Sequence, residues 1–217
     1  RQVKTGDTWQ HCLVTTRMIE SCFISNRTSE IGYIFPLFIY PEMEQTDLFN
    51  QFQTDVRANI QEELFGLLLR SYKTEVSPKE IFSYVYAILH SNIYRKKYFV
   101  FLRSNFPRIP FTSERDIFMS ISFLGQRLID LHLLKSSELE HPVAKYQGTG
   151  DDHVITRPKY SENYQRLYIN SSHYFEGLTP EVWNYQIGGY QVLDKYLKDR
   201  KGRRMDDPRY FIRVATA

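Results

Sequence analysis

The sequence predicts an α+β fold, in which a small helical bundle is inserted into a β-rich part formed from both ends of the chain. Short segments of alternating β-branched, aromatic and polar residues occur near the N-terminus and again after about residue 135, as strands require. Between them, apolar residues recur at helical spacing behind helix-start signals. We therefore expect three segments of one compact domain: N-terminal strands and a linker over 1–58, the bundle over 59–135, and a β-rich segment with C-terminal helices over 136–217.

The N-terminal segment contains two predicted strands, "CLVTT" (12–16) and "IGYIFPLFIYP" (31–41). Pro36 removes a backbone donor from the second, so we expect that strand at a sheet edge or a bulge. The acidic run after Pro41 is interpreted as a loop or linker, and a helix follows from near Asn59. The predicted buried face of this helix carries Ile60, Leu64, Leu67 and Leu68.

Three further helices complete the predicted bundle. Residues 77–80, Ser-Pro-Lys-Glu, form a capping box with proline at the first helical position and start the first of them. The second starts near Asn92, and Ser113 caps the third. Gly125 lies in the middle of the third helix, where glycine is unfavourable by about 1 kcal/mol, so we expect another element to approach there. The third helix is expected to bury Ile117, Phe118, Ile121, Leu124, Leu128 and Leu131.

After residue 135 the chain becomes polar, aromatic and β-prone, with Gly, Pro and Asn between short segments. A terminal helix is expected from the sequence Asp-Asp-Pro at 206–208, because proline is favoured in the first turn. The predicted strands are "VAKYQG" (143–148), "HVITRPKY" (153–160), "RLYIN" (166–170) and "PEVWNYQIGG" (180–189).

The stretch "IGGYQVLDKYLKDRKGRRM" (187–205) combines a glycine pair, an amphipathic helix pattern and a cationic end. Gly188 and Gly189 permit a sharp strand-to-helix turn. Four bases lie beyond the predicted helix, where they either complement the helix dipole or contact phosphates. Complementing a dipole needs one or two charges, so the number of bases favours phosphate contact. These bases are Arg200, Lys201, Arg203 and Arg204.

Charge is unevenly distributed along the chain, although the net charge is only +3 and the pI is near 8.7. The range 42–63 holds six acids and one base, whereas 95–108 holds five bases and no acid. Such segregation indicates one electropositive face, which is typical of nucleic-acid binding. The alternative is that the basic stretches are solvated helix faces.

Cys12 and Cys22 are the only cysteines, and no C-x-x-C motif occurs, so we expect free thiols and a cytoplasmic location. His11 with the two cysteines lacks a fourth zinc ligand at a recognisable spacing. The run 151–153, Asp-Asp-His, is more simply interpreted as a solvated loop than as a metal site. No apolar run is long enough to span a bilayer, and no signal peptide is visible.

Catalytic motifs are absent from the sequence: it has no P-loop, no G-x-S-x-G and no H-E-x-x-H. No Pro-Pro pair occurs, so the Asn-Pro-Pro-Tyr type of loop used by amino-methyltransferases is also missing. The chain begins at Arg1, without an initiator methionine, and is interpreted as a fragment of a longer protein. We therefore expect a binding module rather than an enzyme.

Three stretches resemble a known family. "PEVWNYQIGGYQVLDKYLKDRKGR", "EIFSYVYAILHSNIYRKKYFVFLRSNFPRIPF" with "LGQRLIDLHLL", and "FPLFIYP" are similar to the C-terminal specificity domain of Type ISP restriction–modification enzymes and related large adenine-specific DNA methyltransferases. The resemblance spans roughly 31–204. It implies a target recognition domain that binds double-stranded DNA, preceded in the parent chain by a methyltransferase core that uses S-adenosylmethionine, and in some members by a nuclease and a helicase. No cofactor is implied for the fragment itself.

With this resemblance, two sets of DNA-contacting residues are expected. Phosphate contacts are assigned to the four basic residues of 200–204 and to a second basic helix. Recognition of DNA bases is assigned to the polar-aromatic range 145–173, because Arg and Lys read guanine while Asn and Gln read adenine. The second phosphate set is Arg95, Lys96 and Lys97, and the base-reading set is Lys145, Gln147, Arg157, Lys159, Asn163 and Gln165. Two other readings stay open: a structural module that packs against the core or a partner subunit, and a small enzyme in its own right.

Overall fold

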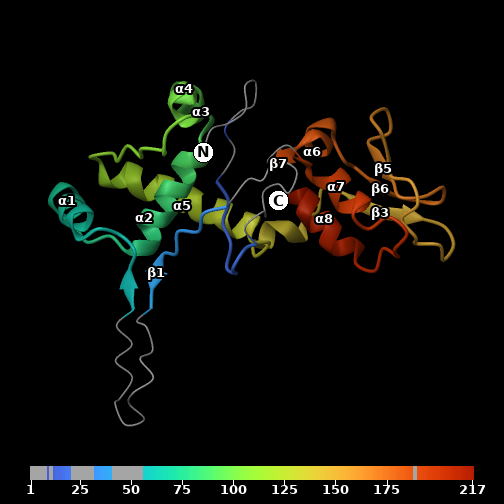
Figure 1. Ribbon diagram of the computed structural model, residues 1–217, viewed down its shortest axis with the longest axis horizontal. Helices are drawn as coiled ribbons and strands as arrows, with labels where there is room; N and C mark the ends of the chain where they lie inside the picture. Colours follow the sequence, from blue (N-terminus) through green and yellow to red (C-terminus); the bar gives the residue numbers. More distant parts are fainter. Residues whose placement is uncertain (1–8, 10–11, 21–31, 41–55, 188–189) are drawn as a thin grey trace, which may run out of the picture. The chain divides into compact units, whose positions relative to one another are not determined.

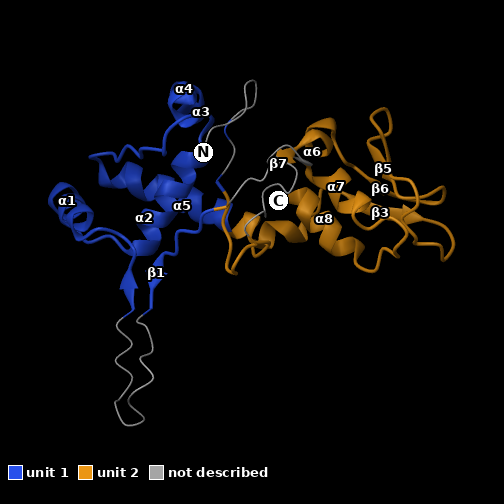
Figure 2. Cartoon of the chain, in the orientation of Figure 1, with its two compact units in different colours: residues 1–12, 33–129 blue, residues 13–32, 130–217 orange. Residues whose placement is uncertain are grey.

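The chain is described by a computed structural model, which places residue 9 and residues 12–20, 32–40, 56–187 and 190–217. Helices and short antiparallel strands both occur in these ranges, which confirms the α+β class. The chain divides into two compact units (Figure 2): unit 1 is Arg1–Cys12 with Tyr33–Ile129, and unit 2 is Leu13–Gly32 with Asp130–Ala217. Within the described ranges, no helix is long and apolar enough to cross a membrane.

Unit 1 is mainly helical (Figure 1). Its helices are α1 (Glu62–Tyr72), α2 (Pro78–His90), α3 (Asn92–Lys97), α4 (Phe99–Leu102) and α5 (Arg115–His132). The capping box is confirmed, because the Ser77 hydroxyl accepts from the Glu80 amide at 3.2 Å and the Glu80 carboxylate accepts from the Ser77 amide at 2.6 Å. The single helix expected from Asn92 is divided into α3 and α4 at Tyr98.

The core of unit 1 is aromatic. Phe118 on α5 is fully buried, and its ring lies 4.8 Å from that of Tyr84 on α2 and 5.2 Å from that of Tyr72 on α1. The buried positions of α5 are Phe118, Ser122, Gly125 and Ile129, which define its contacting stripe. Ile117 and Leu124 each lie one residue before this stripe and are exposed, so their predicted burial is wrong; Leu67 is exposed for the same reason beside Leu68 on α1.

Tyrosine hydroxyls fix the connection between α4 and α5. Tyr84 donates to the Pro110 carbonyl at 2.8 Å, Tyr94 donates to that of Arg108 at 2.8 Å, and Tyr72 donates to that of Thr112 at 2.6 Å. Each bond satisfies a hydroxyl that would otherwise be costly to bury. The range 106–111, "FPRIPF", is thus held as an extended connector across three helices.

The close approach expected at Gly125 is confirmed. A Cβ atom added there would lie 1.9 Å from the carbonyl oxygen of Ser83 on α2. No side chain fits that space, so the absence of a Cβ sets the distance between α2 and α5.

The N-terminal strands differ from the expectation. Only Phe38–Ile39 (β1) is extended within 32–40, and it pairs antiparallel with Arg57–Ala58 (β2) in unit 1. Residues 12–16 form no strand. The Asn59 side chain donates to the Pro36 carbonyl at 2.9 Å, so residues 57–59 close this ribbon locally. Among the described residues, the larger sheet is therefore built from the C-terminal part of the chain alone. The acidic run over 42–55 lies outside the described residues.

Unit 2 contains a four-stranded antiparallel sheet. Its strands are β3 (Lys145–Gly148), β4 (Lys159–Ser161), β5 (Arg166–Tyr168) and β6 (His173–Glu176), in the spatial order β3-β6-β5-β4. The remaining elements are η1 (Ser137–Glu140), α6 (Pro180–Asn184), β7 (Gln186–Ile187), β8 (Tyr190–Gln191), α7 (Val192–Lys198) and α8 (Pro208–Thr216).

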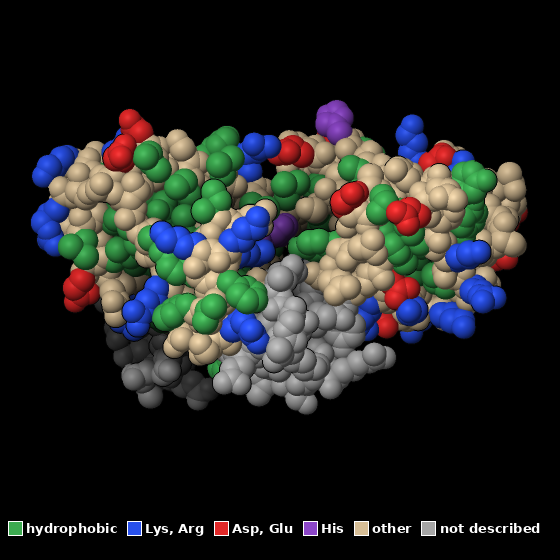
Figure 3. Space-filling view, turned by 90° about the horizontal axis from the view of Figure 1, so that it is seen from above, with side chains coloured by type: hydrophobic (Ala, Val, Ile, Leu, Met, Phe, Trp, Pro, Cys, Tyr) green, Lys and Arg blue, Asp and Glu red, His purple; other side chains and the backbone are tan. Residues whose placement is uncertain are grey.

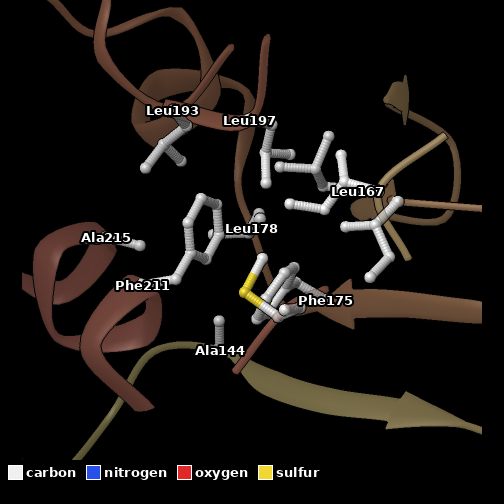
Figure 4. Close-up of a cluster of buried hydrophobic side chains, with 11 residues drawn as sticks. Ala144, Leu167, Phe175, Leu178, Leu193, Leu197, Phe211 and Ala215 are labelled. Carbon is white, nitrogen blue, oxygen red and sulfur yellow. The ribbon is translucent and has the colours of Figure 1, made fainter. Parts of the chain in front are cut away.

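Helices α7 and α8 cover one face of this sheet (Figure 4). Leu167 of β5 and Phe175 of β6 are fully buried against Leu197 of α7 and Phe211 of α8. The rings of Phe175 and Phe211 lie 4.2 Å apart. Because the covering helices come directly before and after residues 199–207, this core also fixes both ends of the cationic loop.

The strand expected over 180–189 is wrong for its first five residues, which form α6. Thr179 caps this helix, since its hydroxyl accepts from the Val182 amide at 3.5 Å, and Pro180 occupies the first turn. This local start signal outweighs the β-propensity of the aromatic residues that follow. The strand part begins only at Gln186, and the glycine pair at 188–189 lies outside the described residues.

Candidate nucleic-acid interface

The sheet of unit 2 has a second face that α7 and α8 do not cover. Strand alternation and register place eight side chains together on it, because directly paired residues share a face. We call these eight the outer face: Lys145, Gln147, Lys159, Ser161, Arg166, Tyr168, Tyr174 and Glu176. The opposite, buried face of the same strands includes Tyr146, Tyr160, Leu167 and Phe175, all of which pack on the core.

The outer face carries three cations and one carboxylate. The cations Lys145 and Lys159 come from the two edge strands and are exposed. Between them, Arg166 on β5 is directly opposite Glu176 on β6, and its Nε and Nη2 both donate to one carboxylate oxygen, at 3.0 and 2.6 Å. Gln147 adds an exposed amide on β3. This arrangement presents cationic and amide donors from the strands of one sheet.

Aromatic rings fill the middle of the outer face. The guanidinium carbon of Arg166 lies 4.5 Å from the ring centroid of Tyr174, within the range of a cation–π interaction. The rings of Tyr168 and Tyr174 are 5.3 Å apart. Hydrogen bonds to Glu176 and then to Tyr168 raise the pKa of Arg166 above its ordinary value, so the guanidinium stays charged. Cations and aromatic rings alternate across this surface, as in many nucleic-acid-binding sheets.

The other predicted base readers lie beside the outer face. Asn163 and Gln165 belong to the turn between β4 and β5, and both are exposed. Arg157 is exposed just before β4, and its amide donates to the Ile169 carbonyl at 3.3 Å. The structure thus brings Lys145, Gln147 and Lys159 onto one face, with Arg157 and the turn residues at the ends of the same strands.

The cationic loop after α7 is held by backbone hydrogen bonds. Ile155 donates to the Arg203 carbonyl at 2.9 Å, Gly202 donates back to Ile155 at 2.7 Å, and Met205 donates to His153 at 2.9 Å. Gly202 has a φ of 81°, a left-handed conformation that favours glycine. The loop is therefore a defined turn rather than a free tail.

The four cations of this loop do not have the same surroundings. Arg200 folds back on α7, where its Nη1 donates to the Tyr196 carbonyl at 3.2 Å and its guanidinium carbon lies 3.8 Å from the Tyr196 ring centroid. Arg204 donates to the Asp151 carbonyl at 3.3 Å. Lys201 and Arg203 are exposed. Two side chains thus stabilise the turn, while two extend from it and are better placed for phosphates.

A partly buried tyrosine–histidine cluster supports the segment that pairs with this loop. The Tyr146 hydroxyl and His153 Nδ1 are 2.9 Å apart, and the rings of His153 and His173 are 4.3 Å apart. Burial raises the pKa of Tyr146. Asp152 Oδ1 accepts a hydrogen bond from the Val154 amide at 3.1 Å, so this carboxylate stabilises the local turn. In the described part of the chain, no three His, Cys, Asp or Glu side chains form a metal-binding group; His11 and Cys22 lie outside it.

The remaining predicted phosphate contacts belong to unit 1. Arg95 donates to the Leu89 carbonyl at 2.7 Å and lies 5.7 Å from the Trp9 ring centroid, so it connects the ends of α2 and α3. Lys96 and Lys97 are exposed on α3. On the face drawn in Figure 3, Lys and Arg side chains are dispersed among hydrophobic ones over each unit rather than gathered into one continuous area. The assignment of Arg95, Lys96 and Lys97 to phosphates stays a prediction.

Sequence reasoning missed the aromatic and acidic members of the outer face. Tyr168, Tyr174 and Glu176 alternate with buried residues on β5 and β6, and this period of two was the available signal. Their grouping with Lys145 depends on the strand order β3-β6-β5-β4, which is a non-local property of the chain.

Comparisons with known proteins are consistent with this fold. A family model described as the Type ISP C-terminal specificity domain matches residues 1–212. The chain is similar to a cryoEM structure of a DrdV–DNA complex, with a TM-score of 0.60 at 22% identity over 83% of this chain and 19% of that chain. It is also similar to the ATP-dependent Type ISP restriction-modification enzyme LlaBIII bound to DNA, with a TM-score of 0.59 at 20% identity over 83% of this chain and 12% of that one. No protein of curated function matches the sequence.

Proposed function

Because this chain belongs to the Type ISP C-terminal specificity domain family, we propose that it is a sequence-specific duplex DNA recognition domain of a restriction–modification enzyme. The observation that carries the proposal is the outer face of unit 2, where Lys145 and Gln147 on one edge strand and Lys159 on the other lie on the same face of one sheet. Solved enzymes with a similar domain were captured with DNA, which supports the same ligand here.

The geometry suggests that different parts of unit 2 bind the bases and the phosphates of the DNA. Amide and cationic side chains on strands have the donors that distinguish base edges in the major groove, which admits a two-stranded β-ribbon. Lys201 and Arg203 are exposed cations on an ordered turn. Such side chains can contact the phosphates of the DNA backbone, which position a protein without reading sequence. We assign base readout to the outer face with its adjoining turn, and phosphate binding to the cationic loop.

We assign the catalytic activity to the longer parent chain of which this domain would be a part. This chain spans only 19% and 12% of the two matched chains. We propose that the parent contains an adenine-N6 methyltransferase core, which binds S-adenosylmethionine, and that this domain positions the core on its DNA site. Restriction endonuclease activity would belong to the parent as well. Cys12 is a free thiol, in agreement with the proposed cytoplasmic location.

A second candidate function is packing against the methyltransferase core or another subunit. Apolar side chains on the helices of unit 1 favour it, because monomers rarely expose large apolar patches. Hydrophobic side chains are visible on unit 1 in Figure 3. On its helices the exposed ones include Val100 (81%), Ile93 (79%), Phe123 (65%), Leu67 (56%) and Leu124 (56%). This role is compatible with DNA recognition by unit 2, since it uses different residues.

The test is binding of the chain to a duplex library with a randomised centre, followed by electrophoretic shifts over a salt series. A recognition domain enriches one short motif, and its affinity falls with salt at a slope of about −0.9 per phosphate contact. A packing module without base readout enriches no motif and gives no shift even at low salt. Either of these negative results would remove the proposal.

A further inference from the structure

The turn between β4 and β5 projects two exposed side chains from an ordered base. Tyr164 is 68% exposed, and Asn163 beside it is exposed as well. At the base of the turn, the Gln165 carbonyl accepts from the amides of Gly177 and Leu178, at 3.0 and 3.1 Å. Gln165 itself has a φ of 48°, an uncommon conformation for a residue with a side chain. The surrounding structure thus holds the turn in one shape while its tip remains open.

Arg166 lies directly behind this tip and is held by its neighbours. Its Nε and Nη2 both donate to the Glu176 carboxylate, and its guanidinium carbon lies 4.5 Å from the Tyr174 ring and 5.9 Å from the Tyr164 ring. Reading guanine requires two parallel donors from the same fork. In Arg166 the Nε–Nη2 edge of that fork faces Glu176, which fixes the direction of the guanidinium and leaves only the Nη1–Nη2 edge for another partner.

We propose that the β4–β5 hairpin enters a groove of the DNA tip first, that Asn163 and Tyr164 contact the bases there, and that Arg166, held by Glu176, is a positioning residue. This inference rests on the proposed function and specifies which part of the surface reads sequence. It assigns Asn163 and Tyr164 to base contact and gives Arg166 a positioning role.

The chemistry of the tip fits a nucleic-acid base better than an apolar partner. In a groove, the ring of an exposed tyrosine can make apolar contact with a thymine methyl, and an asparagine amide pairs with the Hoogsteen edge of adenine through two hydrogen bonds. Lys159 at the start of the hairpin supplies positive charge, whereas the charge of Arg166 is compensated by Glu176. Because the turn and the Arg166 side chain are already ordered, binding loses little conformational entropy.

The experiment compares the motif selected from the randomised duplex library by the wild-type chain and by variants. Tyr164→Ala is expected to lower affinity for the selected duplex about tenfold to a hundredfold and to remove preference at one or two adjacent positions. Tyr164→Phe, which keeps the ring, is expected to retain the motif. Tyr185→Ala is the matched control, because Tyr185 is also in unit 2 and is 53% exposed. The salt slope is expected to be unchanged in all three variants.

Glu176→Ala tests the positioning role. Release of the Arg166 guanidinium is expected to weaken the base preference at the same motif positions as Tyr164→Ala. The thermal unfolding midpoint of the variant is recorded to exclude a folding defect. Arg166→Lys keeps the charge, loses the fork and is expected to give the same weakening. A direct contact from Arg166 to guanine would give a different result, namely the loss in Arg166→Lys of a guanine preference at a position that Tyr164→Ala leaves unchanged.

The experiment distinguishes failure of the proposed function from failure of the assignment of the hairpin tip. A wild-type chain that enriches no motif would overturn the proposed function itself. A wild-type chain that enriches a motif which Tyr164→Ala preserves at every position would leave the proposed function standing and overturn the assignment of the hairpin tip.

Discussion

Single atoms decide several features of this domain, and Gly125 is the clearest case. We predict that Gly125→Ala lowers the free energy of unfolding by about 1–3 kcal/mol, the usual cost of overpacking, since the added Cβ would lie 1.9 Å from a backbone oxygen of α2. Gly66→Ala is the matched control in α1, where the nearest atom is a flexible Arg70 nitrogen at 3.5 Å. There we expect stabilisation of up to about 1 kcal/mol from helix propensity. Denaturant unfolding of both variants measures the contrast, and equal effects would contradict the packing described at Gly125.

Cys12 gives a chemical test of the packing in unit 1. Burial raises its pKa to about 11, although Arg95 opposes the shift. The thiol therefore remains protonated at pH 8, and since only the thiolate reacts, we expect alkylation about a hundredfold slower in the folded chain than in the denatured one. The rate should climb as the pH is raised toward 11. Peptide-level mass spectrometry separates Cys12 from Cys22, and equal rates in folded and denatured chains would contradict the packing around the half-buried Cys12.

At the scale of elements, helix starts carry most of the local information. Ser77 and Glu80 form a reciprocal capping box at α2. Ser77→Ala is expected to lower the free energy of unfolding by about 1 kcal/mol, whereas Ser77→Thr, which keeps the hydroxyl, is expected to lose much less. Thermal denaturation measures both. A threonine variant as unstable as the alanine variant would show that the cap is not the source of the loss.

The same elements show what could be predicted from the sequence. The starts of α2 and α8 were predicted because Ser77 and Asp207 mark them with local signals that the structure retains. The start at Thr179 has the same kind of signal, but the aromatic residues after it favoured a strand. The outer face could not be assembled from sequence, because Lys145 and Arg166 share it only through the strand order and register. Likewise, the contact of Arg200 with Tyr196 depends on a side-chain conformation that no pattern specifies.

At the scale of the whole molecule, the charge distribution makes a prediction about salt. Lys201 and Arg203 extend from the cationic loop, whereas Arg200 packs on α7. The double change Lys201→Ala with Arg203→Ala is expected to weaken binding to all DNA sequences alike and to flatten the salt slope by about two units. Arg200→Ala is expected to leave the slope unchanged and to lower thermal stability. A double variant with the wild-type slope would show that this loop does not contact phosphates.

The central claim, that unit 2 reads DNA sequence through its outer face, is tested most directly by a specificity ratio. This ratio compares the dissociation constants of the selected duplex and of a scrambled duplex at one fixed salt concentration. The triple change Lys145→Ala, Gln147→Ala and Lys159→Ala is expected to reduce the ratio at least about a hundredfold, since each base contact contributes about 1–3 kcal/mol of discrimination. The control pair Lys79→Ala and Arg115→Ala removes the same charge from exposed helix positions of unit 1 and is expected to keep the ratio. A triple variant that retains the wild-type ratio would contradict the claim.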